Sequence, residues 1–203
     1  MQSTGGTSAR PPRPDQLRAF SPRLEQALAV TLVAHAGQTR KGSPMPYAVH
    51  PLHVTWILAR HSQDEDLLVA ALLHDVVEDT DWTLEGLRER FGARVAAIVG
   101  ELSEDKRDSW SVRKERAIAG VAALSEGALL VKACDKLHNL STLADDLASR
   151  RDPAGLWAAF HGGREGTLSV ARRMGEALAL RAPATLAAEL LAAVERLERL
   201  AQP

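Results

Sequence analysis

Apolar residues recur at helical spacing along most of the chain, whereas no segment shows the sustained alternation of a β-strand. The clearest repeats are Leu24, Leu28 and Leu32, followed later in the chain by Val95, Val99 and Leu102. Residues three or four apart share one face of an α-helix, so each repeat predicts an amphipathic helix with one buried side. With 203 residues and 45% hydrophobic content, the chain can bury one substantial core. The sequence therefore predicts an all-α fold, a helical bundle of about eight to ten helices.

The first 20 residues are rich in Ser, Thr, Gly and Pro and offer little to bury. We therefore expect residues 1–20 to form a flexible tail and residues 21–203 to form a single domain. Inside that domain, Gly42, Pro44 and Pro46 predict a constrained loop over 38–51, and charged residues predict a second loop over 103–111. The expected helices span residues 21–37, 50–58, about 65–78, a short segment ending at 91–92 with a cap at Asp81 or Thr83, 113–124, 128–147 and about 185–200.

The segment 72–79 places His74, Asp75, Glu78 and Asp79 at the end of an apolar run. Asp64 can cap the helix that carries them, because its short side chain can accept from the free N–H groups of a first turn. On a continuous helix from about 65 to 78, residues four apart share a face, and four ionisable groups would then emerge into an apolar interior. Burying such groups without partners is costly, and a divalent cation offsets that cost.

Two further residues complete a ligand set of two imidazoles and two carboxylates, namely His50 before Pro51 and Asp135 in an apolar helical segment. We therefore predict that His50, His74, Asp75 and Asp135 bind one metal ion. The alternative is a set of hydrogen-bonded core histidines and a solvated Glu-Asp pair. The combination of all four residues in apolar or proline-flanked segments favours the metal.

Composition excludes several classes of protein. A net charge of −1 argues against a general nucleic-acid surface, although Arg40-Lys41 beside a metal would suit a phosphorylated small molecule. The single cysteine, Cys134, excludes an internal disulfide and fits a reducing cytoplasm. No run approaches the ~18 apolar residues of a membrane span, and no signal peptide is present. Walker, GxGxxG and GxSxG motifs are also absent.

The chain resembles the HD-domain phosphohydrolases, and within them the hydrolase domain of the Rel/Spo stringent-response enzymes and the stand-alone small alarmone hydrolases. The resemblance runs from about Ala29 to Leu143, in several motifs that follow one another in the same order. The matching motifs are His35-Ala36-Gly37-Gln38, Arg40-Lys41-Gly42, Pro46-Tyr47, His50-Pro51, Ala70-Ala71-Leu72-Leu73-His74-Asp75, Glu78-Asp79-Thr80, Phe91-Gly92 and Asp135-Lys136-Leu137-His138-Asn139-Leu140.

The resemblance implies that the four predicted ligands hold one divalent metal, usually manganese, and that Glu78-Asp79 is the catalytic acidic pair. It also implies that Arg40, Lys41 and Asn139 line a nucleotide site. The family removes pyrophosphate from the 3′ position of guanosine 3′,5′-bis(diphosphate) and its pentaphosphate form, giving GDP or GTP. The expected partner is therefore a small nucleotide, with neither nucleic acid nor membrane.

Other functions remain compatible with these residues. The sequence after Leu143 follows a bacterial HD subgroup more closely than it follows the alarmone hydrolases, so a different nucleotide is one alternative: an adenosine alarmone, a deoxynucleotide or a dinucleotide phosphate. Another alternative is an HD module that binds a nucleotide without hydrolysing it. No synthetase segment follows the hydrolase motifs, so synthesis of the alarmone is not expected. The sequence indicates no oligomeric state.

Overall fold

The computed structural model describes residues 20–149 and 153–202, and within them all regular structure is helical apart from one isolated bridge between Thr39 and Pro46. The helices are α1 (Pro22–Ala34), α2 (Val49–Ala59), α3 (Glu65–Leu73), α4 (Val76–Asp79), α5 (Leu84–Phe91), α6 (Ala93–Leu102), α7 (Trp110–Gly120), a 3₁₀ turn η1 (Val121–Ala123), α8 (Glu126–Ser149), α9 (Pro153–Ala158), α10 (Gly163–Ala179) and α11 (Ala184–Leu200). The all-α prediction is confirmed. If the single turn α4 is counted with α3, the described α-helices number ten, within the expected range.

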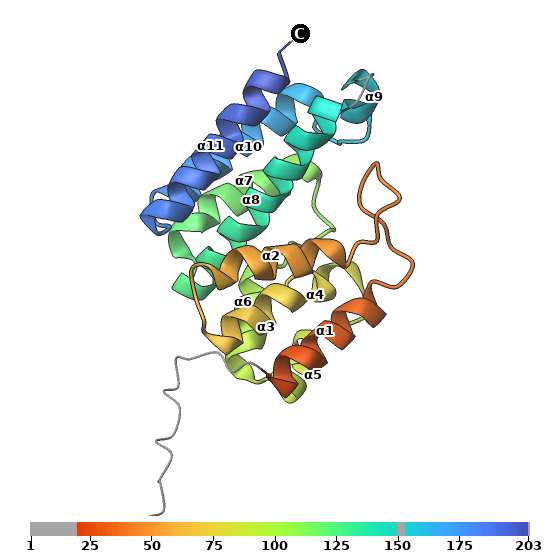
Figure 1. Cartoon of the computed structure of the whole chain (residues 1–203), viewed down its shortest axis with the longest axis vertical. Helices are drawn as coiled ribbons and strands as arrows, with labels where there is room; N and C mark the ends of the chain where they lie inside the picture. The colour runs from red at the N-terminus through yellow and green to blue at the C-terminus, as the bar shows by residue number, and fades with distance from the viewer. Residues whose placement is uncertain (1–19, 150–152, 203) are drawn as a thin grey trace, which may run out of the picture.

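Helix α8 joins two groups of helices. Figure 1 shows α1 to α6 gathered in one half of the molecule, with α10 and α11 side by side in the other. Helix α8 packs against α2, α3 and α6 from the first group and against α10 and α11 from the second. Its sequence explains this position, because buried residues occur along its whole length, from Ala128 to Leu147. A long helix that is apolar on several sides must be covered on several sides.

Helix α3 lies in the core and has almost no solvent-facing side, since every residue from Leu67 to Leu73 is buried. The residue that follows its last turn, His74, is therefore also in the interior.

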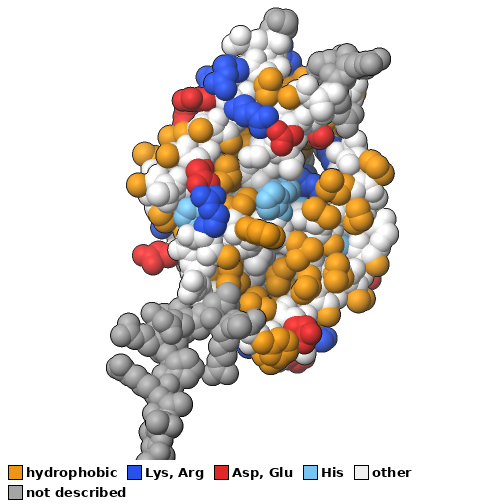
Figure 2. All heavy atoms as spheres, viewed as in Figure 1, with side chains coloured by type: hydrophobic (Ala, Val, Ile, Leu, Met, Phe, Trp, Pro, Cys, Tyr) orange, Lys and Arg blue, Asp and Glu red, His pale blue; other side chains and the backbone are white. Residues whose placement is uncertain are grey.

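Helix α2 has two different faces. His50, Val54 and Leu58 point to the core at i, i+4 and i+8, whereas Trp56 is 75% exposed. Figure 2 shows hydrophobic side chains spread over the face on which α2 lies.

Three predicted helix starts are confirmed by their caps. Ser21, Asp64 and Thr83 each accept a backbone N–H from the first turn, at 3.1, 3.0 and 3.1 Å. Thr83, and not Asp81, is therefore the cap of α5. Ser109 caps α7 in the same way, so this helix begins at Trp110, before the expected Arg113, and the charged loop is shorter than predicted.

The first helix ends at Ala34, before the expected Gly37, because the chain turns at Gly37 with a positive φ of 78°. The following loop is held by backbone hydrogen bonds from Arg40 N–H to the Met45 carbonyl and from Tyr47 N–H to the Gln38 carbonyl.

The predicted tail lies outside the described residues except for Phe20, and the single domain over 21–203 stays a prediction. No helix in the described ranges combines the length and the apolar character that a membrane crossing needs.

Candidate metal centre

The expected continuous helix over 65–78 is wrong, because α3 ends at Leu73 and α4 begins at Val76, with His74 and Asp75 between the two helices. Asp75 adopts φ −101° and ψ −6°, in the bridge region between helical and extended backbone. The end of α3 is stabilised from outside, since the buried Thr31 hydroxyl of α1 donates to the Leu72 carbonyl at 2.8 Å. Such carbonyls in a last turn lack donors within their own helix. The break therefore rests on tertiary contacts.

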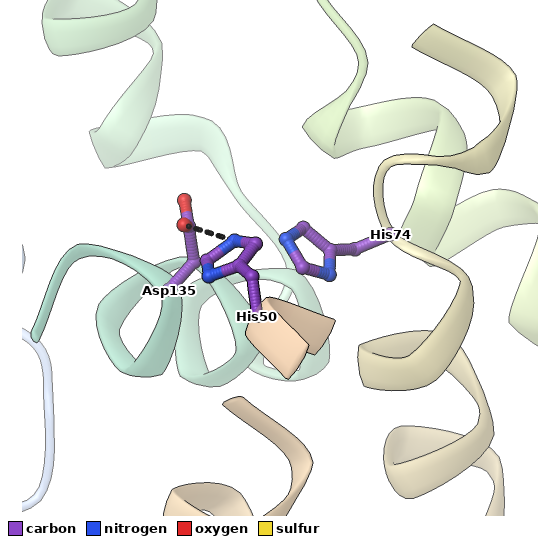
Figure 3. A group of neighbouring side chains, drawn as sticks. All are labelled: His50, His74 and Asp135. Atoms are coloured by element: carbon purple, nitrogen blue, oxygen red, sulfur yellow. Dashed lines mark ion pairs between the residues drawn. The ribbon is translucent and has the colours of Figure 1, made fainter. Parts of the chain in front are cut away.

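The break and two other helices bring the predicted ligands together. His50 comes from the start of α2, His74 and Asp75 from the break, and Asp135 from α8. One ligand atom each of His50, His74 and Asp135 lies within 4.8 Å of the others. Figure 3 shows these three side chains next to one another. His50 Nε2 is 3.3 Å from Asp135 Oδ1 and 3.5 Å from Asp75 Oδ2. Ligands about 2.1 Å from one ion lie about 3 to 4 Å apart, so this spacing is close to that of a metal site.

The imidazole of His74 shows that the centre fits a cation. Its Nδ1 donates to the Ala71 carbonyl at 2.8 Å, which leaves Nε2 to hold either a proton or a metal ion. Its Nε2 is buried without a hydrogen bond, and it faces Asp75 Oδ2 at 3.1 Å outside hydrogen-bonding geometry. A carboxylate oxygen at this distance favours a positive charge on or beside Nε2, which a proton or a metal ion can supply. The histidine and aspartate cluster is therefore compatible with a divalent metal.

The electrostatics of the centre support the same ligand chemistry. Burial opposes the charged form of His74, but the Asp75 carboxylate outweighs it and raises the His74 pKa to about 9. Burial likewise opposes the charge on Asp135, yet Lys136 and His50 hold the pKa of that carboxyl well below its usual range. Burial lowers the pKa of His50, which favours its neutral form. A metal would replace the proton on His74 and share the two carboxylates.

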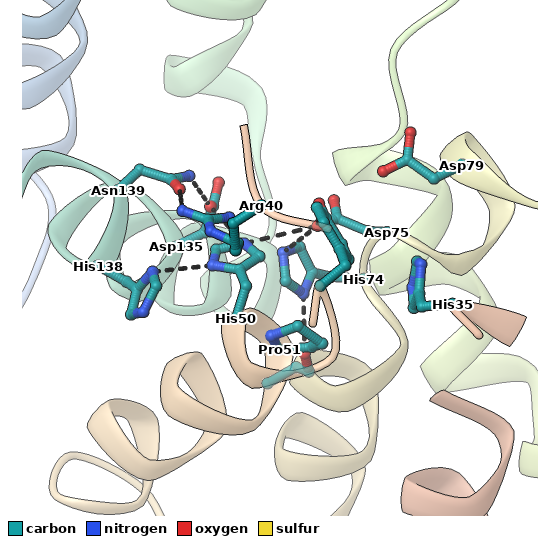
Figure 4. Close-up of polar contacts among 12 residues, drawn as sticks. His35, Arg40, His50, Pro51, His74, Asp75, Asp79, Asp135, His138 and Asn139 are labelled. Carbon is teal, nitrogen blue, oxygen red and sulfur yellow. Dashed lines mark hydrogen bonds and ion pairs between the residues drawn. The ribbon is translucent and has the colours of Figure 1, made fainter. Parts of the chain in front are cut away.

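The two acids predicted as catalytic lie next to the centre, and both are bound by the segment after α6. Glu78 Oε2 accepts the backbone N–H of Glu104 at 3.1 Å, and Asp79 forms an ion pair with Lys106. Burial raises the pKa of Glu78. Figure 4 shows Asp79 set apart from the imidazole cluster. Both acids line the same small cavity as the four predicted ligands.

A protein-family model described as HD domain matches residues 27–168, more than half of the chain. The chain belongs to the HD domain family. The matched span includes all four predicted ligands and both acids, so the family assignment and the geometry concern the same part of the molecule.

Several curated relatives in this family are named as enzymes of alarmone metabolism. The chain is 41% identical over 127 residues to the bifunctional (p)ppGpp synthase/hydrolase SpoT of Escherichia coli K12, which covers 60% of this chain but 18% of that protein. It is 37% identical over 146 residues to the guanosine-3′,5′-bis(diphosphate) 3′-pyrophosphohydrolase MESH1 of Drosophila melanogaster, covering 68% of this chain and 82% of the relative. The chain thus spans less than a fifth of the long bacterial relative and most of the short one.

Solved structures agree with this relationship. A structure described as a metazoan ortholog of SpoT that hydrolyzes ppGpp matches with a TM-score of 0.76 and 32% identity, covering 88% of this chain and 97% of that one. A protein from Listeria monocytogenes EGD-e matches with a TM-score of 0.65 and 30% identity, over 72% of this chain and 96% of the other.

Three residues of this HD domain that sequence reasoning did not select hold the predicted ligands in place. The Tyr47 hydroxyl donates to Asp75 Oδ2 at 2.6 Å, and Lys136 Nζ lies 2.8 Å from Asp135 Oδ2. His138 Nδ1 lies 2.9 Å from His50 Nδ1, with both rings buried. Tyr47 was noticeable in the sequence as the only tyrosine of the chain, but its distance in sequence from Asp75 did not indicate that the two residues interact.

The residues expected to line a nucleotide site all line a larger cavity of 620 Å³. Arg40 Nη2 donates to Asn139 Oδ1 at 2.8 Å, an interaction drawn in Figure 4. Lys41 Nζ lies 4.6 Å from the centre of the Phe160 ring. Seven residues line both this cavity and the small polar one of 160 Å³ beside the ligand cluster: Arg40, Tyr47, His50, Glu104, Lys114, Lys136 and Asn139. The two cavities are therefore neighbours that meet at the centre.

Proposed function

We propose that this chain hydrolyses guanosine 3′,5′-bis(diphosphate) and its pentaphosphate form at the 3′ position, giving GDP or GTP plus pyrophosphate. The observation that carries the proposal is the meeting of a metal-ligand cluster, two acids and Arg40-Lys41 around two adjoining cavities. The choice of substrate is supported by MESH1 of Drosophila melanogaster, because that relative carries this activity in its name and is matched over most of its length.

The proposal assigns His50, His74, Asp75 and Asp135 as ligands of one divalent metal. Two imidazoles and two carboxylates without a thiolate suit manganese better than a structural zinc, so we propose Mn²⁺. When bound, the metal would act as a Lewis acid toward a phosphate oxygen and would acidify a water molecule. Tyr47 and Lys136 orient Asp75 and Asp135 through the contacts described above.

Proton transfer is assigned to Glu78 and Asp79. Water adds its oxygen to the phosphorus next to the nucleoside, the bond from phosphorus to the 3′ oxygen breaks, and that oxygen takes up a proton. Burial raises the pKa of Glu78, which suits a group that must both accept and return a proton near neutral pH. Arg40, Lys41 and Asn139 would bind the nucleotide at the larger cavity, where cationic groups offset the charge of its phosphates. We place this reaction in the cytoplasm, on a small nucleotide and without nucleic acid.

The test is a panel of nucleotides incubated with the manganese-loaded protein, with the products separated by ion-exchange chromatography. The panel contains guanosine 3′,5′-bis(diphosphate), its adenosine counterpart, GTP and a deoxynucleoside triphosphate, and the matched control is Asp75→Asn, which keeps the shape of a ligand and removes its charge. We expect GDP and pyrophosphate in equal amounts from the first substrate and none from the control. Faster turnover of the adenosine compound would indicate that the site prefers adenine to guanine. Tight binding without turnover of any substrate would indicate a binding module in place of an enzyme.

A further inference from the structure

The small cavity is lined by two chemically different groups of side chains. One group is the cluster of imidazoles and carboxylates described above, and the other includes three lysines, Lys114 from α7 and Lys132 and Lys136 from α8. Two of these lysines are already paired within the protein: Lys114 Nζ lies 2.8 Å from Glu104 Oε1, and Lys136 Nζ lies 2.8 Å from Asp135 Oδ2. Their charges therefore serve carboxylates that belong to the site.

Lys132 is different. Only 7% of the residue is exposed, and its ammonium group forms no hydrogen bond or ion pair with the described residues. Burial and the neighbouring Lys136 lower its pKa, while Asp135 and Glu104 act in the opposite direction without contacting it. A lysine that is largely enclosed and whose ammonium group has no partner in the protein is costly to keep charged, so a residue of this kind in the lining of a cavity indicates an anion in that cavity.

The size of the cavity limits which anion can bind. A volume of 160 Å³ is close to that of a cavity that holds one benzene-sized molecule, about 150 Å³. That space suits a group as small as a diphosphate and excludes a nucleoside, which needs the adjoining cavity of 620 Å³ with its Trp110, Phe160 and Met174 side chains. A nucleotide with phosphates on its ribose would therefore lie with its nucleoside in the larger cavity and a phosphate chain in the smaller one.

We propose that Lys132 binds the terminal phosphate of the 3′-diphosphate and then holds the pyrophosphate product, so that the small cavity selects a diphosphate over a single phosphate. The inference rests on the proposed function for the identity of the nucleotide. After the bond to the 3′ oxygen breaks, both phosphorus atoms and the oxygen from water stay in the small cavity, and the nucleoside leaves from the large one. The Lys132 ammonium donates to oxygens of the outer phosphate and forms no covalent bond.

A purely structural role makes the opposite prediction for stability. If Lys132 stabilises the fold by offsetting the charges of Asp135 and Glu104, its removal should destabilise the protein. If it binds an anion in the cavity, replacing it with a neutral side chain of similar length removes a largely enclosed charge that has no partner in the protein, and the metal-free protein should be as stable or more stable.

The test is Lys132→Met, compared with Arg172→Gln, which removes one positive charge from an exposed pair with Glu198 on α10 and α11. Binding of inorganic pyrophosphate and of inorganic phosphate to the manganese-loaded protein is measured by calorimetry and as product inhibition. Thermal unfolding is measured without metal. We expect pyrophosphate to bind about 10- to 100-fold more weakly to Lys132→Met, as for the loss of a charged hydrogen bond, with phosphate changed less than about threefold. The control should match the wild-type protein.

Three outcomes would overturn the inference: unchanged pyrophosphate binding, an equal loss for phosphate and pyrophosphate, or a Lys132→Met protein that unfolds at a lower temperature or does not fold. The proposed function fails separately. Wild-type protein that binds pyrophosphate through Lys132 but does not hydrolyse the alarmone would keep the diphosphate subsite and remove the substrate. If the wild-type protein hydrolyses the alarmone but Lys132→Met does not change pyrophosphate binding, the substrate stands and the diphosphate subsite is refuted.

Discussion

Replacing His138 should weaken metal binding although His138 is not a proposed ligand. Its Nδ1 lies 2.9 Å from Nδ1 of His50, and the two rings are 4% and 1% exposed. A metal on Nε2 of His50 requires the hydrogen of that neutral ring to be on Nδ1, so His138 must accept it. His138 thereby fixes both the tautomer and the orientation of a ligand. In His138→Leu, the Nδ1–H of His50 stays buried without an acceptor.

The size of the effect follows from that unpaired donor. A buried group left without its partner costs about 1 to 3 kcal/mol, which corresponds to about 5- to 150-fold in affinity for manganese. The same range holds for other residues that orient metal ligands, at about 10- to 100-fold. Affinity is measured by competition with a chromophoric chelator, and circular dichroism verifies that the variant is folded. His138→Asn should recover much of the loss, because its side-chain oxygen can replace Nδ1 as the acceptor.

The matched control is His53→Leu. His53 lies next to the His138 ring, with 4.8 Å between the ring centroids, but it is exposed and forms no hydrogen bond with a proposed ligand. It should leave the manganese affinity within about twofold, since no donor or acceptor of the centre changes. Equal affinities for wild-type protein, His138→Leu and His53→Leu would refute the argument that His138 sets the tautomer of His50.

Three further predictions concern the acidic pair, His74 and the packing of α8. Glu78→Gln and Asp79→Asn should keep bound metal but lower turnover by about 10² to 10⁴, and full activity of both in steady-state assays would leave the pair a structural role. The metal-free protein should lose stability as pH rises from about 6.5 through 9, because a raised His74 pKa stabilises the fold only while the ring is protonated; thermal unfolding across that range should show the loss, and excess manganese should remove it. Gly127→Ala would place a Cβ 2.7 Å from a buried leucine methyl of α3 and should destabilise the protein by about 1 to 3 kcal/mol in urea unfolding, whereas Gly120→Ala, with nothing within 4 Å, should not.

The helices were predictable where their signals are local. Ser21, Asp64 and Thr83 are short side chains before apolar repeats, and each caps a helix as expected. The break at His74-Asp75 has no such signal, because neither glycine nor proline interrupts the segment and its residues are compatible with a helix. The contacts that stabilise the break come from Thr31 and Tyr47, 41 and 28 residues away in sequence. Local patterns cannot report partners at that separation.

The candidate site divides in the same way. Residue types identified His50, His74, Asp75 and Asp135 as a possible ligand set, and the structure brings them together. Lys132 gave no signal, because a lysine beside apolar residues is normally a surface residue that extends its charge into water. Its burial follows from the position of α8 between two groups of helices, which depends on how the whole bundle packs.

The break between α3 and α4 is also what allows two neighbouring residues to serve one centre. Successive residues of a straight α-helix point about 100° apart, so His74 and Asp75 could not both face the same ion from the continuous helix that the sequence suggested. In the structure, α3 ends before these two residues, and His74 Nε2 and Asp75 Oδ2 lie 3.1 Å apart. The Thr31 hydroxyl donates to the Leu72 carbonyl at the end of α3 at 2.8 Å, and the Tyr47 hydroxyl holds the Asp75 side chain by donating to its Oδ2 at 2.6 Å. Helix geometry thus explains why these two hydroxyls, neither of them a ligand, matter to the centre: without the bend that they support, His74 and Asp75 would face different sides of the helix.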